Sequence, residues 1–283
     1  MAIGCALAWA AAVMLFRRAG EVPAIALNLF KNAVATTLLI VTMLAAGIPF
    51  DAARSPAHWA LLIGSGILGL ALADTLFLAG LRRIDASVAA VADCAYSPTV
   101  VALSAAFLGE HVGGGLIAGG LLVVVGLAVV SVRAGSAKRA VDGRGVALAL
   151  AGVVTTAIGV VLAKPALGRS DLLEATTVRL CAGTAALYLS QLVVGRGREA
   201  LALFKPQPIW KAAVPAAVLG TYVAMILWLG GMKYGTASRA ALLNQSGAIF
   251  VLVLSRLAGE AVPLRRWVGA GIAVAGVGVI LAR

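Results

Sequence analysis

Residues 69–110 read GLALADTLFLAGLRRIDASVAAVADCAYSPTVVALSAAFLGE, and residues 220–260 repeat the pattern as GTYVAMILWLGGMKYGTASRAALLNQSGAIFVLVLSRLAGE. Each copy has two apolar runs that are joined by a short basic turn, and each ends in Gly-Glu. Gly69 aligns with Gly220 at the start of the two copies. Because self-similarity at a long separation reflects the architecture of a chain, we infer two homologous halves.

The two copies differ in their polar residues. The first carries Asp74 and Asp93 inside apolar runs, whereas the second has Met225 and Asn244 at those places. Repeats that share a scaffold but diverge in polar residues are typical of one site that two halves build asymmetrically. We therefore expect a single site between the halves.

The composition excludes a soluble domain. Of the 283 residues, 62% are hydrophobic and 12% are charged, with a mean hydropathy of +1.03. Soluble domains are about half apolar and about a quarter charged. Apolar runs of about 18 or more residues indicate membrane-spanning helices, and the strands of a membrane barrel would alternate in polarity. The sequence predicts an all-α membrane protein.

The net charge of +12 arises from basic residues in the turns between apolar runs. There they set topology and meet anionic lipid headgroups, so the expected partner is the lipid bilayer and not nucleic acid. The three cysteines are scattered within apolar helices, without disulfide or metal-ligand spacing. We therefore predict no metal and no cofactor.

Ten apolar segments divide the chain. They lie at about 2–16, 22–46, 58–80, 86–108, 112–132, 144–167, 172–194, 209–231, 236–257 and 265–282. We predict a first repeat at 1–132, a basic linker at 133–144 and a second repeat at 145–283. Because five spans per half is an odd number, tandem halves enter the membrane from opposite sides. Ten transmembrane helices in two inverted-topology five-helix repeats are a common plan of secondary transporters.

With these features the chain resembles the EamA family of the drug/metabolite transporter superfamily. The resemblance is carried by Leu7-Ala8-Trp9, by Leu108-Gly109-Glu110, by Ala258-Gly259-Glu260, and by the basic residues Lys31 and Arg179 in spans two and seven. It implies a multi-pass protein of the plasma (inner) membrane that transports a small metabolite or drug by alternating access between two bundles. It leaves the substrate, the direction of transport and the coupling ion open.

The orientation in the membrane is predicted differently by two arguments. Members of the family usually keep both termini in the cytoplasm. Most Lys and Arg residues of this chain lie in the odd-numbered loops, such as Arg82 and Arg83, and the positive-inside rule then places these loops in the cytoplasm and both termini outside. We favour the charge bias because it runs through both halves.

Polar residues inside three spans are candidates for substrate binding. An ionisable group deep in a bilayer costs about 2.5–3.5 kcal/mol on insertion scales, which makes it functional by default. Asn28, Lys31 and Asn32 share one face of the second span because they lie three and four residues apart. Asp74 lies in the third span and Arg179 in the seventh.

Spans four and nine contribute the remaining candidates. Asp93 lies in the middle of span four, and Tyr96 and Ser97 share its face. Asn244 and Gln245 occupy the corresponding place in span nine. We expect Asp93, Lys31 and Asn244 to line a central cavity.

The chemistry of these residues suggests their roles. Asp93 could bind a substrate amine or carry a coupling proton, since desolvation raises the pKa of a carboxyl group. Lys31 or Arg179 could hold a substrate carboxylate. Alternatively, Lys31 and an aspartate form a buried pair that only fixes helix register. Glu110 and Glu260 lie at helix junctions, where we expect each to cap the following helix.

The leading prediction is a secondary transporter of a small metabolite or drug that exports amino-acid-like or related solutes, and not an enzyme. An intramembrane enzyme that acts on lipids, or a non-catalytic receptor or scaffold, is the alternative, although no HExxH, GxSxG or clustered carboxylate motif occurs. Glycines at small-residue spacings in spans five and ten allow close helix contacts. Such contacts could lie within a half or between the subunits of a homodimer.

Overall fold

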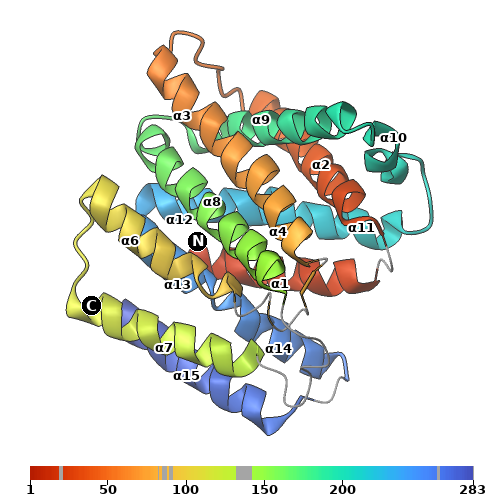
Figure 1. Cartoon of the computed structure of the whole chain (residues 1–283). Coiled ribbons are helices and arrows are strands. Elements are labelled where there is room, and N and C mark those ends of the chain that lie inside the picture. The colour runs from red at the N-terminus through yellow and green to blue at the C-terminus, as the bar shows by residue number, and fades with distance from the viewer. Residues whose placement is uncertain are drawn as a thin grey trace.

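The computed structural model describes residues 1–18, 22–81, 83–84, 88, 92–131, 142–259 and 262–282. Within these ranges every regular element is helical (Figure 1). The first half contains α1 (Ala2–Arg18), α2 (Ala24–Ala45), α3 (Pro56–Gly66), η1 (Ile67–Leu72), α4 (Ala73–Leu81), α6 (Tyr96–Leu108) and α7 (Gly114–Ser131). Most of the predicted linker 133–144, and Glu260, lie outside the described residues.

The second half repeats this order of helices. It contains α8 (Gly143–Gly168), α9 (Leu172–Val193), α10 (Gly197–Ala200), η2 (Ala202–Phe204), α11 (Trp210–Ala217), η3 (Val218–Val223), α12 (Ala224–Tyr234), α13 (Ala237–Asn244), α14 (Gly247–Leu257) and α15 (Leu264–Leu281). Because α10 and η2 are short, they serve as the connection between α9 and α11.

Many of the helices are suited to a membrane. Within the described part of the chain, 6 helices are long and apolar enough to cross a membrane: Ile25–Ala45, Pro56–Phe77, Gly143–Gly168, Trp210–Tyr234, Ala237–Leu257 and Leu264–Leu281. Shorter apolar helices span Ala2–Phe16, Tyr96–Leu108 and Gly114–Val129. The chain is therefore a multi-pass, all-helical membrane protein. Helix α9 does not meet these criteria, since Glu174, Arg179 and Gln191 lower its hydropathy.

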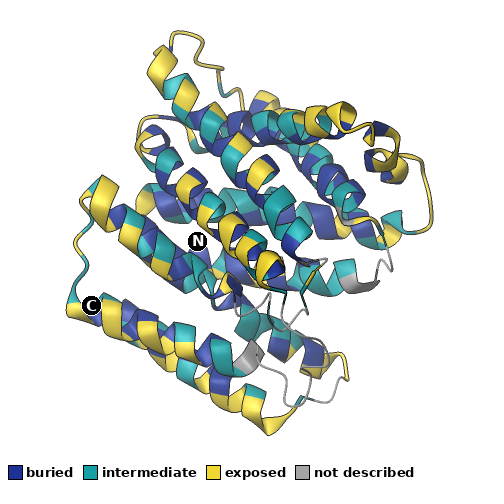
Figure 2. Ribbon diagram, viewed as in Figure 1, coloured by how far each residue is buried: buried dark blue, intermediate teal, exposed yellow. Residues whose placement is uncertain are grey.

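The outer surface of the bundle is apolar. Large hydrophobic side chains are exposed on outward faces, for example Leu44 of α2, Leu121 of α7 and Val268 of α15. Figure 2 shows exposed residues along the outer faces of α7 and α15, with buried residues between the helices. An apolar exterior around a packed interior is the arrangement that lipid requires.

The two halves interlock symmetrically. The third span of the first half, α3–η1–α4, packs against α8 and α9 of the second half. Its counterpart in the second half, α11–η3–α12, packs against α1 and α2 of the first half. The third span of each half therefore packs against the first two helices of the other half.

Glycines bring α7 and α15 together. A Cβ atom added to Gly119 would lie 2.7 Å from the Gly276 carbonyl oxygen, and one on Gly276 would lie 2.6 Å from the Gly119 carbonyl oxygen. These two helices run side by side at the bottom of Figure 1. The glycine-rich spans five and ten therefore contact each other across the two halves of one chain, which is neither of the two arrangements expected from the sequence.

Gly66 is where α3 approaches α9 most closely. A Cβ atom on Gly66 would lie 2.2 Å from the Arg179 carbonyl oxygen, which is backbone and cannot move aside. We expect Gly66→Ala to force the helices apart and to cost about 1–3 kcal/mol or more. The apparent Tm of the purified protein should fall by several degrees.

Gly271 of α15 provides the matched control for this substitution. No heavy atom lies within 4 Å of a Cβ atom built there. Gly271→Ala should leave the apparent Tm unchanged or raise it slightly, because alanine favours helix. Equal melting temperatures for the Gly66 and Gly271 variants would contradict the packing that we describe between α3 and α9.

Candidate functional site

Both halves carry a π-helical turn at the same place in their third span. The turn η1 interrupts the helix between α3 and α4, and η3 interrupts it between α11 and α12. Gly69 lies in the first turn and its sequence counterpart, Gly220, lies in the second. Single π-helical turns occur frequently at functional sites, because they widen the helix and free backbone groups.

Spans four and nine are also interrupted at corresponding positions. In span four, Asp93 is the last helical residue before a turn at Cys94 and Ala95, and α6 begins at Tyr96. The proline ring of Pro98 explains this turn, since it has no N–H to donate to the carbonyl group of Cys94. A backbone hydrogen bond from the amide of Ala95 to the carbonyl of Ala92 (3.0 Å) tightens the chain there.

The interruption in span nine has a different local cause. Helix α13 ends at Asn244, Gln245 and Ser246 form the turn, and α14 follows. No proline lies here; instead, the Ser246 hydroxyl group donates to the Leu243 carbonyl oxygen at 2.7 Å. A serine hydroxyl group that bonds to a nearby backbone carbonyl competes with the regular hydrogen bonds of the helix. Two different sequences therefore produce the same break.

Asp93 and Asn244 lie at the two breaks. Asp93 is exposed, although many protein atoms surround its carboxylate. The Asn244 side-chain oxygen is buried and has no hydrogen-bond partner. Because a buried polar atom without a partner costs about 1–3 kcal/mol, this oxygen is suited to accept a hydrogen bond from water or a bound solute.

Tyr96 and Arg179 form one polar group near the first break. The ring of Tyr96 packs on Trp228 with a centroid distance of 6.1 Å, and its hydroxyl group interacts electrostatically with both Asp93 and Arg179. The Arg179 guanidinium group donates to the Ser65 hydroxyl at 2.7 Å and to the Gly159 carbonyl at 3.3 Å.

Arg179 is buried without an acidic partner among the residues that the structure describes. Its side chain is 3% exposed, and its Nε atom makes no hydrogen bond. A buried guanidinium group normally pairs with an anion. This residue can therefore either brace three helices through neutral acceptors or receive an anionic group of a solute.

The remaining candidates of spans four and nine have mixed surroundings. Ser97 is fully buried, and its hydroxyl group donates to the Ala241 carbonyl oxygen of α13 at 3.2 Å. This bond joins span four to span nine, so Ser97 ties the halves together. Gln245 is half-buried in the second break.

A second polar group lies between α2 and α4. Lys31 donates to the Asn32 side-chain oxygen at 3.0 Å, and its charge attracts that of Asp74. Asn28 lies beside Asp74, although neither of its amide atoms makes a hydrogen bond of acceptable geometry. The Asn32 amide nitrogen is also buried without a partner. Several unpaired donors and acceptors here surround one carboxylate and one ammonium group.

The structure thus brings the predicted site residues together in two groups. The first contains Asn28, Lys31, Asn32 and Asp74; the second contains Asp93, Tyr96, Ser97, Arg179, Asn244 and Gln245. Within the described residues, no hydrogen bond or ion pair joins one group to the other. The aspartate whose charge attracts that of Lys31 is Asp74.

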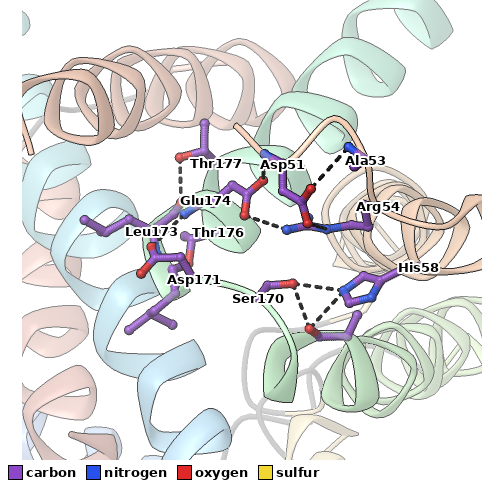
Figure 3. Close-up of polar contacts among 12 residues, drawn as sticks. Asp51, Ala53, Arg54, His58, Ser170, Asp171, Leu173, Glu174, Thr176 and Thr177 are labelled. Carbon is purple, nitrogen blue, oxygen red and sulfur yellow. Dashed lines mark hydrogen bonds and ion pairs between the residues drawn. The ribbon is translucent and has the colours of Figure 1, made fainter. Parts of the chain in front are cut away.

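One buried ion pair was not expected from the sequence. The Arg54 guanidinium group lies 2.5 Å from the Glu174 carboxylate, with both side chains 3% exposed (Figure 3). The other oxygen of Glu174 accepts from the Asp51 amide at 2.8 Å. Nothing in the sequence predicts that Arg54, in a loop, pairs with Glu174, in the first turn of a helix that lies far away along the chain. Their contact joins the α2–α3 loop to α9.

Glu110 also differs from its prediction. Its carboxylate caps the N-terminus of α13, with bonds of 2.6 Å from the Ala237 amide and 3.0 Å from the Ser238 amide. The expectation that Glu110 caps the helix that follows it is wrong, because the helix it caps belongs to the other half. The corresponding prediction for Glu260 concerns a residue outside the described ones.

Comparison with known proteins identifies the fold and the family. A solved crystal structure of another protein superposes with a TM-score of 0.83 at 22% identity, covering 98% of this chain and 94% of that one. At this identity the likeness shows the fold alone. No curated protein matches the sequence. The profile of the EamA-like transporter family matches residues 1–132 and 143–282. The chain therefore belongs to the EamA-like transporter family, which lies within the drug/metabolite transporter superfamily.

Proposed function

We propose that the chain is a secondary transporter that moves a small metabolite or drug by alternating access, with its substrate site near the membrane midplane between the two repeats. The observation that carries this proposal is the matched interruption of spans three, four, eight and nine. Discontinuous helices at corresponding places in two repeats are typical of substrate sites in transporters. Ten spans in two inverted repeats complete the proposed architecture.

The substrate class that fits these residues is an amino-acid-like solute, which we propose is exported. Asp93 offers an anion to a substrate amine, and Arg179 or Lys31 offers a cation to a carboxylate. The unpaired amide atoms of Asn28 and the unpaired amide nitrogen of Asn32 can form hydrogen bonds with the polar parts of a solute. A proton bound to Asp93 would couple transport to the proton gradient, and no cofactor is required.

A thermal-shift screen tests this assignment. The detergent-purified protein is heated with amino acids, polyamines, nucleosides or cationic dyes, and the same panel is repeated with Asp93→Asn. We expect an amino acid or related amine to raise the apparent Tm of the wild type but not that of the variant. Stabilisation of both proteins by the same compounds would remove Asp93 from the site.

The alternative function is an intramembrane enzyme that acts on lipids, or a receptor or scaffold. Within the described residues, no group of three or more His, Cys, Asp or Glu side chains could hold a metal ion. No observation specifically favours either alternative. Saturable solute flux by the purified protein would distinguish the transporter from both.

We further propose a plasma (inner) membrane location with the odd-numbered loops in the cytoplasm, as the distribution of Lys and Arg indicates. A membrane-impermeant maleimide should label Ala282→Cys, at the end of α15, in intact cells. It should label Lys205→Cys, in the exposed connection between α9 and α11, only after permeabilisation. The reverse pattern would show that both termini lie in the cytoplasm, as is usual for members of the family. We also propose that the chain forms a homodimer.

A further inference from the structure

Glu110 connects the two halves at one face of the bundle. Besides the two α13 amides, its carboxylate accepts a bond of 2.6 Å from the Ser238 hydroxyl group. Helix α13 already has a cap of its own, because the Thr236 hydroxyl accepts from the Arg239 amide at 3.2 Å. Glu110 therefore adds a second cap, and its negative charge is favourable at the positive end of a helix.

Two lysines on the same face as Glu110 donate hydrogen bonds to backbone carbonyl groups of neighbouring helices. Lys164 of α8 donates to the carbonyl oxygens of Met232 and Gly235 at the C-terminal end of α12. Its ammonium group also lies close enough to Glu110 for the two charges to attract. Lys233 donates to the Ser170 carbonyl oxygen in the connection between α8 and α9. Cations near helix C-termini satisfy carbonyl groups that have no partner within the helix.

The contacts of Arg54 and Glu174 belong to this face as well. Figure 3 shows the α2–α3 loop held against the start of α9, where the Asp171 carboxylate accepts from the Leu173 amide at 2.8 Å. His58 Nε2 lies 2.9 Å from the Ser170 hydroxyl oxygen. Polar contacts thus join the ends of α3, α6, α8, α9, α12 and α13.

The contacts of Glu110 lie close to the candidate site. Helix α13 runs from Ala237, which Glu110 caps, to Asn244 at the break. Seven residues of helix span about 10 Å. A movement of α6 away from α13 that also releases the Ser97 hydroxyl group from the Ala241 carbonyl oxygen would therefore uncover the break from this side.

We infer that Glu110 is a gating residue: its bonds to Ala237 and Ser238 hold this membrane face closed, and their release opens the candidate site to that face. The inference rests on the proposed function. Two of the bonds come from backbone amides and one from the Ser238 hydroxyl group, all at the end of α13, where water can replace the lost carboxylate once α6 has moved away. Because solvated hydrogen bonds exchange at a small net cost, such contacts suit two states of similar free energy.

Labelling of a buried cysteine tests the gate without a substrate. In full-length protein with Cys5, Cys94 and Cys181 replaced by alanine, Ala240→Cys reports on α13, one turn below Glu110's contacts. Ala213→Cys in α11 reports on the opposite face. Both positions are buried. The rate of reaction with a fluorescent maleimide is measured in detergent.

We expect Glu110→Ala to raise the labelling rate at position 240 about tenfold or more, since three bonds to a charged group are lost. The rate at position 213 should change less than about twofold. Glu110→Gln, which keeps one neutral acceptor oxygen, should give an intermediate rate. Glu199→Ala removes an exposed carboxylate from α10 and should change neither rate.

Two results would overturn the gate. An unchanged rate at position 240 in well-folded Glu110→Ala and Glu110→Gln proteins would make Glu110 a static cap. An equal increase at both reporter positions would show general loosening of the fold. Because no solute takes part in the labelling experiment, neither result bears on the transporter proposal. Conversely, an absence of solute flux would contradict the transporter proposal and leave the labelling result unaffected.

Discussion

Asp93→Asn is expected to reduce transport by about tenfold or more while the protein stays folded, because an ionisable residue within a membrane span is functional by default. The substitution keeps the shape of the side chain and removes the negative charge that we propose for an amine or a proton. Because Asn244 already occupies the corresponding break of the other half, an asparagine at this position is compatible with the fold. Uptake of a tritium-labelled amino-acid mixture into proteoliposomes measures the effect.

The control for this loss is Glu199→Gln, which alters an exposed carboxylate in the short helix α10. Its uptake should stay within about twofold of the wild type, because surface substitutions have small effects. Wild-type rates for Asp93→Asn, with normal gel-filtration and melting behaviour, would show that Asp93 has no central role.

The largest stability effect is expected at the buried pair of Arg54 and Glu174. Glu174→Gln leaves the Arg54 charge buried at a distance of 3.8 Å from Asp51, which is the remaining carboxylate nearby. Breaking a buried pair by removing one partner costs about 3–5 kcal/mol. The apparent Tm should therefore fall by more than about 6 °C.

The chain offers a matched exposed pair as the control. Arg83 lies 3.5 Å from Asp142, with side chains that are 50% and 38% exposed. Arg83→Gln should change the apparent Tm very little, because exposed pairs contribute about 0–1 kcal/mol. Replacing both buried partners, as in Arg54→Met with Glu174→Leu, should restore part of the lost stability. Equal shifts for the buried and the exposed pair would contradict this account.

The internal repeat predicted much of the architecture. The alignment of Asp93 with Asn244, made on sequence alone, coincides with the breaks in spans four and nine. The family and the all-helical membrane fold are confirmed. These features were accessible because they depend on composition and on residue spacing, which a single sequence records directly.

Other features were not accessible from the sequence, for physical reasons. The π-helical turn η1 has the sequence ILGLAL, in which nothing distinguishes it from an α-helix. Pro215 precedes η3 in the same span, but a proline predicts a kink and not a π-helical turn. The partners of Arg54 and Glu110 come from the other half of the chain. Such contacts depend on how the halves interlock, and residue spacing within one segment carries no record of that arrangement.

The central claim is that the two repeats form an alternating-access transporter, and solute exchange across a membrane tests it most directly. Proteoliposomes that contain the wild-type protein are loaded with an unlabelled compound that the thermal-shift screen identifies, and entry of its labelled form is followed. We predict saturable entry that the internal compound accelerates and that Asp93→Asn abolishes. Entry that rises linearly with concentration, without acceleration by internal compound, would contradict alternating access and indicate a channel.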